Sequence, residues 1–321
     1  MTYVGHRAPA VSPDLPRGTD PTSGSARLRD VVAAYVGLTK PRVIELLLLT
    51  TVPVMFFAAG GVPDLGLVVA TVVGGALSAG SASALNCVYD RDIDEQMRRT
   101  RRRALPRHIV TPVAALVFGI ALGVVATAIL WWFVNPLSAL LALAAECFYL
   151  FVYTMLIKRR TTQNIVWGGL AGCFPALIGW TAVTDQLAWA PVVLFLVVFF
   201  WTPPHTWALA LRYREDYAGV DVPMLPAVAN AETVARQVVL YSWAMVLTSL
   251  LLWPVADTGW FYPVAALALW AVFLVQAHAM WSRSRGTEDL AVIRPMVLFH
   301  SSNLYLSLLF VSVALDPLLT R

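Results

Sequence analysis

Charged residues are scarce in this sequence. They make up 13% of its 321 residues, whereas soluble proteins carry about 25%. The hydrophobic share is 59%, and apolar runs long enough to cross a bilayer recur from residue 43 onward. The scarcity of charge excludes a soluble globular domain and predicts an all-α, polytopic membrane protein.

Cysteines are also few, and their positions exclude two kinds of site. Cys87, Cys147 and Cys173 are the only three. All fall within stretches predicted to be helical, and none has the spacing of metal ligands. They form neither a disulfide framework nor a zinc site. The net charge of +4 does not indicate a nucleic-acid partner, because the basic residues lie in loops between the apolar runs.

The chain divides into a polar tail and a membrane domain. Residues 1–26 are rich in Pro, Ser, Gly and Thr and lack the hydrophobic core of a signal peptide, so we expect a disordered cytoplasmic tail. Residues 27–321 form the membrane domain. We expect nine transmembrane helices in it, at residues 43–59, 65–89, 112–133, 137–157, 164–183, 187–211, 237–256, 260–281 and 297–315.

The basic residues predict how these helices are oriented. If the N-terminus is cytoplasmic and nine spans alternate, only Arg321 of the 23 Lys and Arg residues falls outside the cytoplasmic segments. Those segments are the tail with the residues that lead to the first span at residue 43, and residues 90–111, 158–163, 212–236 and 282–296. This distribution follows the positive-inside rule. It predicts a multi-pass protein of the cell membrane whose polar rim faces the cytoplasm.

A polar motif ends the second predicted helix. Asn86, Asp90 and Asp94 recur at every fourth position, so they share one helix face. Each step rises about 6 Å, a separation at which two carboxylates can span a small metal cluster. The helix dipole disfavours anions at this end, so the acids need cations nearby. An isolated pair of acids at this spacing is more often a solvated loop end, but the intramembrane start of this motif favours a metal site.

A second polar stretch follows the sixth predicted helix. His205, Leu209, Arg212 and Asp216 fall close to one helix stripe. If the two rims face each other, Asp90, Asp94 and Asp216 would form a site for divalent cations. A few hard oxygen ligands suit Mg²⁺, which bridges to substrate phosphates. A diphosphate on an apolar chain would place its charge at this rim and its chain between the helices.

Several basic and polar residues near the rim have two interpretations each. Lys158, Arg159 and Arg212 could bind the diphosphate, or they could be anchors at the membrane surface. His205 could contact an acceptor, or it could be a hydrogen-bonded core histidine. The remaining candidates have no assigned role: Glu45, Glu146, Glu215, Asp221, His278 and His300.

Several segments resemble the UbiA superfamily of intramembrane prenyltransferases, specifically its protohaem IX farnesyltransferase (haem O synthase) branch. The resemblance covers about residues 30–310. It rests on Thr39-Lys40-Pro41-Arg42-Val43, Asn86 to Asp94 with Arg98-Arg99-Thr100, Tyr153 with Lys158-Arg159-Arg160-Thr161, Asn164-Ile165-Val166, and His205 to Leu209 with Arg212-Tyr213, Asp216-Tyr217 and Pro223-Met224-Leu225-Pro226. The last of these segments distinguishes this branch from relatives that prenylate quinone precursors.

The resemblance implies nine helices around a central cavity open to the cytoplasmic rim, Mg²⁺ as cofactor, and a prenyltransferase domain at residues 27–321. It implies transfer of a farnesyl group from farnesyl diphosphate to a vinyl group of haem B, giving haem O. Asp90 and Asp94 carry over as catalytic ligands of the metal and diphosphate, with Asn86 as their polar neighbour. Asp216 is the firm member of the second motif, in which Arg212 replaces an acid.

Two other functions remain open from the sequence. One is the same chemistry on an aromatic acceptor of quinone biosynthesis. The other is a transporter whose acids bind cations. A transporter would carry its acids near the membrane midplane on broken helices, whereas these acids gather at the rim beside basic residues.

Overall fold

Helices account for the regular structure of the described part of the chain, residues 24–320, and no strand occurs there. This part comes from a computed structural model, with side chains described from Leu28 onward. The elements are α1 Gly24–Thr39, α2 Pro41–Ala59, α3 Leu65–Tyr89, α4 Arg91–Gln96, α5 Pro112–Phe133, α6 Pro136–Cys147, η1 Phe148–Ile157, α7 Asn164–Gly168, η2 Gly169–Cys173, α8 Phe174–Thr184, α9 Trp189–Arg212, α10 Arg214–Ala218, α11 Leu225–Val228, α12 Ala231–Ala256, α13 Phe261–Ser284, α14 Leu290–Ile293 and α15 Pro295–Thr320.

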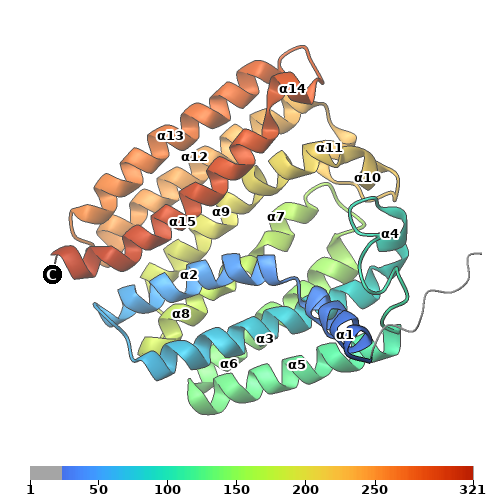
Figure 1. Cartoon of the computed structure of the whole chain (residues 1–321). Helices are drawn as coiled ribbons and strands as arrows, with labels where there is room; N and C mark the ends of the chain where they lie inside the picture. The colour runs from blue at the N-terminus through green and yellow to red at the C-terminus, as the bar shows by residue number, and fades with distance from the viewer. Residues whose placement is uncertain (1–23, 321) are drawn as a thin grey trace, which may run out of the picture.

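The predicted nine spans are confirmed within residues 24–320, where nine helical segments are long and apolar enough to cross a membrane. They lie side by side in one bundle (Figure 1). The π-helical η1 completes the span that α6 begins, and α7, η2 and α8 together form another. One boundary differs clearly from the prediction: α12 begins at Ala231 rather than residue 237. Asn230 caps it there, accepting a hydrogen bond of 2.9 Å from the backbone N–H of Thr233.

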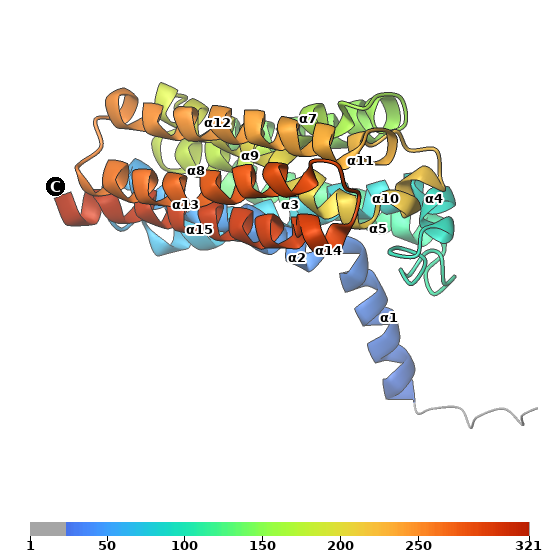
Figure 2. The same cartoon turned by 90° about the horizontal axis from the view of Figure 1, so that it is seen from above.

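Helix α1 was not predicted, and it projects from one end of the bundle (Figure 2). Leu38 and Ala34 bury one side of its C-terminal half, while Leu28 and Val32 are exposed. Lys40 separates α1 from α2 because it adopts a left-handed conformation with φ of 54°, which a helix cannot continue through. Of the predicted disordered tail, residues 1–23 lie outside the described residues, and the last three residues already belong to α1.

The bundle has two parts that are packed differently. The N-terminal part comprises α2, α3, α5, α6, η1 and α8, and the C-terminal part comprises α9, α12, α13 and α15. The C-terminal part contains most of the largest buried core cluster, with fully buried aromatic side chains such as Phe273, Tyr305 and Phe310. Helix α15 packs against both α9 and α2 and thereby joins the two parts.

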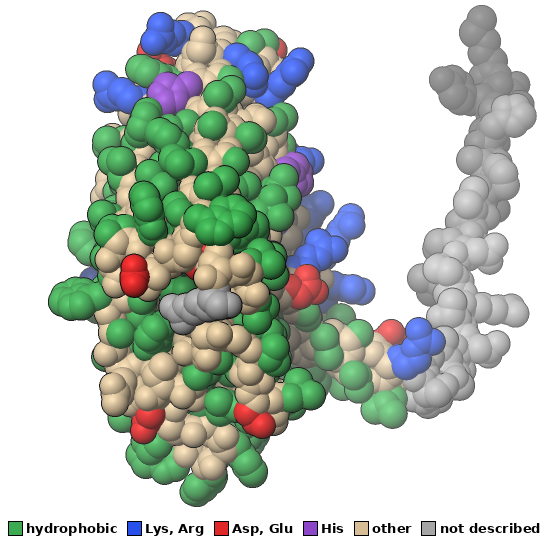
Figure 3. All heavy atoms as spheres, turned by 90° about the vertical axis from the view of Figure 1, so that its left-hand side faces the viewer, with side chains coloured by type: hydrophobic (Ala, Val, Ile, Leu, Met, Phe, Trp, Pro, Cys, Tyr) green, Lys and Arg blue, Asp and Glu red, His purple; other side chains and the backbone are tan. Residues whose placement is uncertain are grey.

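Charge is concentrated at one end of this bundle. Helices α3, η1, α9 and α13 end there with Lys or Arg residues in the following turn or loop. Figure 3 views the molecule from the side of the C-terminus, where the surface is mostly apolar with a few acidic side chains. Lys and Arg side chains come into view only at its margins. The chain is therefore a multi-pass membrane protein with one strongly basic end.

Candidate active site

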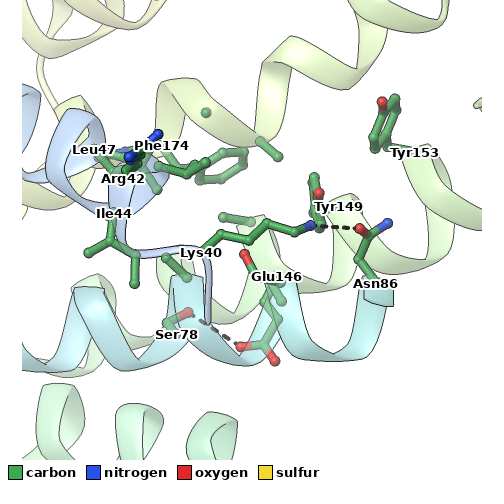
Figure 4. A pocket seen from close by; sticks show the side chains of 18 of the residues that line it. Lys40, Arg42, Ile44, Leu47, Ser78, Asn86, Glu146, Tyr149, Tyr153 and Phe174 are labelled. Carbon is green, nitrogen blue, oxygen red and sulfur yellow. Dashed lines mark hydrogen bonds between the residues drawn. The ribbon is translucent and has the colours of Figure 1, made fainter. Parts of the chain in front are cut away.

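A cavity of about 630 Å³ opens at the basic end of the N-terminal part. Its walls come from α2, α3, α6, η1 and α8, and residues of α4, of the loop after α4, and of the segment between α10 and α11 also line it. Polar side chains gather near the mouth, and the deeper wall is lined by apolar ones such as Ile44, Leu47 and Phe174 (Figure 4). No residue of α12, α13 or α15 lines it within residues 24–320. The cavity therefore lies on one side of the bundle.

Asn86 connects the groups at the cavity mouth. Its side-chain amide donates to Asp90 Oδ2 at 2.7 Å and to Thr154 Oγ1 at 3.2 Å. Its carbonyl oxygen accepts from Lys40 Nζ at 2.9 Å (Figure 4). Both Asn86 and Asp90 are buried. Burial lowers the pKa of the Lys40 ammonium. Asn86 therefore orients a carboxylate on one side and a cation on the other.

The π-helix η1 sets the direction of Lys158. The backbone N–H of Lys158 donates to Tyr153 O, five residues back, at 2.8 Å. At the α-helical turn of about 100° per residue, Lys158 would lie roughly opposite Tyr149. The wider π-helical turns bring Tyr149, Tyr153 and Lys158 to one face, and all three line the cavity. Lys158 there forms an ion pair with Asp90.

The helical register continues across the break between α3 and α4. The N–H of Asp94 donates to Asp90 O at 2.9 Å, and that of Asp90 donates to Asn86 O at 2.9 Å. The predicted four-residue repeat is thus kept. Asp94 lines the cavity and is held by Arg103 at 2.6 Å.

The second predicted rim meets the first, as its sequence suggested. Asp216 on α10 accepts from Arg98 Nε at 2.9 Å and from the backbone N–H of Arg99 at 3.2 Å. Arg98 also binds Glu215 at 2.8 Å. The loop after α3 and the loop after α9 are therefore held together at the cavity mouth, which gives Glu215 a place in this contact. Asp221, in contrast, is exposed.

Arg159 and Arg212 lie outside the cavity lining. Arg159 makes two hydrogen bonds to Asp92, at 2.6 and 2.7 Å, and a longer one of 3.4 Å to Asp90. Its hydrogen bonds to Asp92 lower the pKa of that carboxyl and raise the pKa of the Arg159 guanidinium. Arg212 is exposed and rests over the ring of Tyr213 at 5.9 Å.

Three of the eight predicted site residues line the cavity: Asn86, Asp94 and Lys158. Asp90 and Asp216 are buried and lie outside the lining. Each contacts a lining residue: Asp90 pairs with Lys158, and Asp216 accepts from the backbone N–H of Arg99. The acids do not form one cluster, because no group of three His, Cys, Asp or Glu residues within the described chain could hold a metal. Their oxygen donors nevertheless fit the chemistry of Mg²⁺. The shared metal site stays a prediction.

His205 is not part of the cavity lining. Its ring stacks on Trp201 with centroids 4.2 Å apart, and its Nδ1 lies 2.9 Å from Ser302 Oγ. It also packs against Phe299. These contacts lie between α9 and α15, in the C-terminal part of the bundle. The environment is that of a hydrogen-bonded core histidine, and an acceptor contact at His205 stays a prediction.

The sequence analysis missed several residues at the mouth. Lys40, Arg99, Arg103, Tyr149 and Tyr153 all line the cavity. Lys40, Arg99 and Tyr153 entered only through the segments that resemble the family, and Arg103 and Tyr149 were not identified. The signal that could have identified Lys40 is its position directly before Pro41, a residue that suits the first turn of the helix leading into the predicted span at 43–59. Nothing in the sequence marked the π-helix.

Comparison with known proteins decides the family. Residues 47–303 match the sequence model of the UbiA prenyltransferase family. A Nocardioides sp. protein named Protoheme IX farnesyltransferase is 75% identical, with 99% of each chain covered. The chain belongs to the UbiA prenyltransferase family. Other relatives of this UbiA chain carry the same name: the protein of Cutibacterium acnes is 56% identical (99% of this chain, 95% of that one), and the protein of Streptomyces coelicolor is 57% identical (90% and 91%).

Solved structures share the UbiA fold of this chain. A UbiA homolog from Archaeoglobus fulgidus bound to GPP and Mg²⁺ superposes with a TM-score of 0.65 at 17% identity, covering 87% of this chain and 99% of the other. A digeranylgeranylglyceryl phosphate synthase gives a TM-score of 0.69 at 14% identity, covering 88% and 99%. These structures confirm the helical architecture of the chain.

Proposed function

We propose that this chain transfers a farnesyl group from farnesyl diphosphate to a vinyl group of haem B, giving haem O. The observation that carries the proposal is a cavity within the membrane that has a cationic mouth and an apolar interior. The curated relatives named Protoheme IX farnesyltransferase support the choice of donor and acceptor. The proposed catalytic domain is residues 27–321.

The mouth has the groups that a diphosphate needs. Lys40, Arg103 and Lys158 line it with positive charge, and each already contacts an oxygen atom of Asn86, Asp94 or Asp90. A diphosphate would compete for these donors and gain charge-assisted hydrogen bonds as its negative charge grows on departure.

Asp90, Asp94 and Asp216 would hold Mg²⁺ at this mouth, and the bound ion would supply positive charge to the leaving diphosphate. Asn86 positions Asp90 through its amide hydrogen bond. Arg98 holds Asp216 on the opposite rim. The half-buried Arg159 and the exposed Arg212 would act from outside the lining, by adding positive charge near the rim.

The apolar interior would take the farnesyl chain. Ile44, Leu47 and Phe174 face it from α2 and α8, and such a wall excludes bulk water from a reactive allylic carbon. The acceptor need only be an alkene, because a carbocation-like centre accepts its π electrons. A haem vinyl group meets that requirement and can arrive from the bilayer, with the haem propionates near the arginines of the rim.

We propose that the basic end faces the cytoplasm and that the membrane is the cell membrane. In a variant without the three native cysteines, single cysteines at the exposed Arg102 and Val228 should react with an impermeant thiol reagent only from the cytoplasmic side. One at Gln186, exposed at the other end, should react only from outside. Labelling of Arg102→Cys and Gln186→Cys from the same side would contradict this orientation.

The function is tested with the full chain in vesicles without an imposed gradient. Farnesyl diphosphate, haem B and Mg²⁺ should give a haem that carries a hydroxyfarnesylethyl group, detected by mass spectrometry. EDTA should stop the reaction, and added Mg²⁺ should restore it. Prenylated 4-hydroxybenzoate with unaltered haem would assign the chain to aromatic acceptors. Cation flux without any prenylated product would assign it to transport.

A further inference from the structure

A buried carboxyl group in the cavity wall has no role in the function proposed so far. Glu146 lies at the end of α6, lines the cavity and is 9% exposed. One carboxyl oxygen accepts from the hydroxyl group of Ser78 at 3.3 Å (Figure 4). The other contacts the hydroxyl group of Ser81. An ionisable side chain at this depth is costly unless it has partners or a function.

The partners of Glu146 suit both of its protonation states. Ser81 Oγ also lies 2.7 Å from the carbonyl oxygen of Gly119. A hydroxyl has one proton to donate and a carbonyl can only accept. When Ser81 donates to Gly119 O, its oxygen can accept a hydrogen bond from a protonated Glu146. When Glu146 is ionised, Ser81 and Ser78 can both donate to it. Glu146 can therefore gain a proton without leaving a buried polar group unpaired.

The position of Glu146 suits a reaction just below the cavity mouth. Ser78 and Asn86 lie eight residues apart on α3, which corresponds to about 12 Å along the helix. That distance leaves room for the first farnesyl carbon, a vinyl group and one water molecule between the diphosphate groups and Glu146. Small residues surround the site, namely Gly75, Ala79, Ala82, Ala142 and Ala145. Glu146 and Ser78 offer the two polar partners that a water there requires.

We infer that Glu146 is the general base that activates the water added to the haem during farnesyl transfer. The inference rests on the proposed function. The C1–O bond of farnesyl diphosphate breaks, and its electron pair leaves with the diphosphate. The vinyl π pair forms the new bond to C1, which leaves a cation on the vinyl carbon next to the porphyrin ring. Water oxygen bonds to that carbon, and the water's proton passes to the Glu146 carboxylate.

The test compares two products of one cation. Without a base for water, the cation loses a proton from the neighbouring carbon and gives an alkene, which is lighter than the hydroxylated product by one water. Glu146→Gln keeps an oxygen that can accept from Ser81 and Ser78, but it cannot take up the proton. We expect this variant to keep total farnesyl transfer within about fivefold, and to raise the ratio of alkene to hydroxylated haem at least about tenfold.

A matched control and a second variant complete the experiment. Glu45→Gln makes the same change at an exposed residue outside the cavity lining, so its product ratio should equal that of the unchanged chain. Gly123→Ala keeps the carboxylate but places a methyl group 2.9 Å from Glu146 Oε1. It should displace the carboxyl group and raise the same ratio, which covers the case in which Glu146→Gln does not accumulate.

The outcomes separate the two proposals. If the unchanged chain makes hydroxylated product and both variants give the same product ratio as that chain, Glu146 is not the base, and the proposed function stands. Loss of all transfer in Glu146→Gln at normal membrane abundance also overturns the inference, because farnesylation itself should continue. If the unchanged chain makes no farnesylated haem, the proposed function fails and the inference fails with it.

Discussion

The two parts of the bundle use their buried polar residues in different ways. In the C-terminal part some of these residues tie helix ends together: Tyr262 donates to Ser249 O, and Asp316 accepts from the backbone N–H groups of Gly259 and Tyr262. In the N-terminal part, Asn86 and Glu146 face a cavity and keep part of their surface toward it. A polar residue inside a membrane helix therefore indicates a site only when a cavity adjoins it.

Packing differs in the same way. Aromatic side chains fill the contacts among α9, α13 and α15. Helices α3 and α6, in contrast, present Gly, Ala and Ser to the cavity. Small residues at helix contacts let backbones approach closely. Along the cavity wall they leave space. The C-terminal part is therefore expected to contribute stability, and the N-terminal part to contribute the chemistry.

The largest expected effect is on the mouth of the cavity. Asp94→Asn should lower farnesyl transfer by about a thousandfold, because it removes a proposed metal ligand and leaves Arg103 without its carboxylate. Asp90→Asn should act similarly through Lys158. Turnover is measured together with membrane abundance. Asp92→Asn is the matched control. It removes a partly exposed ion pair with Arg159 and should lower farnesyl transfer by no more than about fivefold. Ordinary turnover in Asp94→Asn would remove Asp94 from the site.

Stability, in contrast to farnesyl transfer, should depend more on the C-terminal part than on the N-terminal part. Phe310→Ala in the closely packed part should destabilise the chain by about 3 kcal/mol, because it leaves a cavity among fully buried neighbours. Leu47 already lines the cavity, so Leu47→Ala should lower the free energy of unfolding by less than about 1 kcal/mol. Denaturation in detergent micelles measures both. Equal losses at the two positions would contradict the division into a stabilising part and a functional part.

His205 tests whether the division holds for a residue that the sequence placed at the site. His205→Phe keeps an aromatic ring on Trp201 but loses the hydrogen bond to Ser302. Ser302 still donates to Phe299 O, so the loss of stability should be about 1 kcal/mol. Farnesyl transfer should stay within about twofold of that of the unchanged chain. A large loss of transfer at ordinary stability would show that the acceptor contacts His205.

The smallest expected effect is an acid-dependent loss of stability shared by both parts. Hydrogen bonds from Arg159 lower the pKa of Asp92 in the N-terminal part. The backbone N–H of Ala231 and the side chain of Arg214 lower the pKa of Glu288 in the C-terminal part. Carboxyl groups with lowered folded-state pKa stabilise above their unfolded pKa of about 4, and this stability is lost as pH falls through the folded value.

Thermal denaturation between about pH 6 and pH 3 measures this effect. The midpoint temperature of denaturation should decrease once the pH is below about 4. Asp92→Asn and Glu288→Gln should each make this decrease smaller. A pH profile that neither substitution changes would mean that these loop contacts do not stabilise the fold.

The sequence predicted the spans and the rim because both depend on local composition. An apolar run long enough to cross the bilayer must be helical, because unpaired backbone groups are too costly in lipid. The four-residue spacing placed Asn86, Asp90 and Asp94 on one face, and their backbone hydrogen bonds keep that register. The basic segments fell at one end because spans alternate in direction. Helix α1 was missed because its first residues follow a Pro- and Ser-rich tail and its apolar residues are too few to form a span.

Only the tertiary structure decided which cation holds each acid and where the cavity lies. Arg103 pairs with Asp94, Lys158 pairs with Asp90, and Arg98 pairs with both Glu215 and Asp216. Lys158 reaches Asp90 from 68 positions away in the sequence because η1 winds as a π-helix. His205 shares a helix with the rim but faces α15, since its surroundings depend on the neighbouring helix. Composition and period therefore determined the helices of this protein, and the contacts between helices determined its site, because those contacts join residues that no sequence spacing relates.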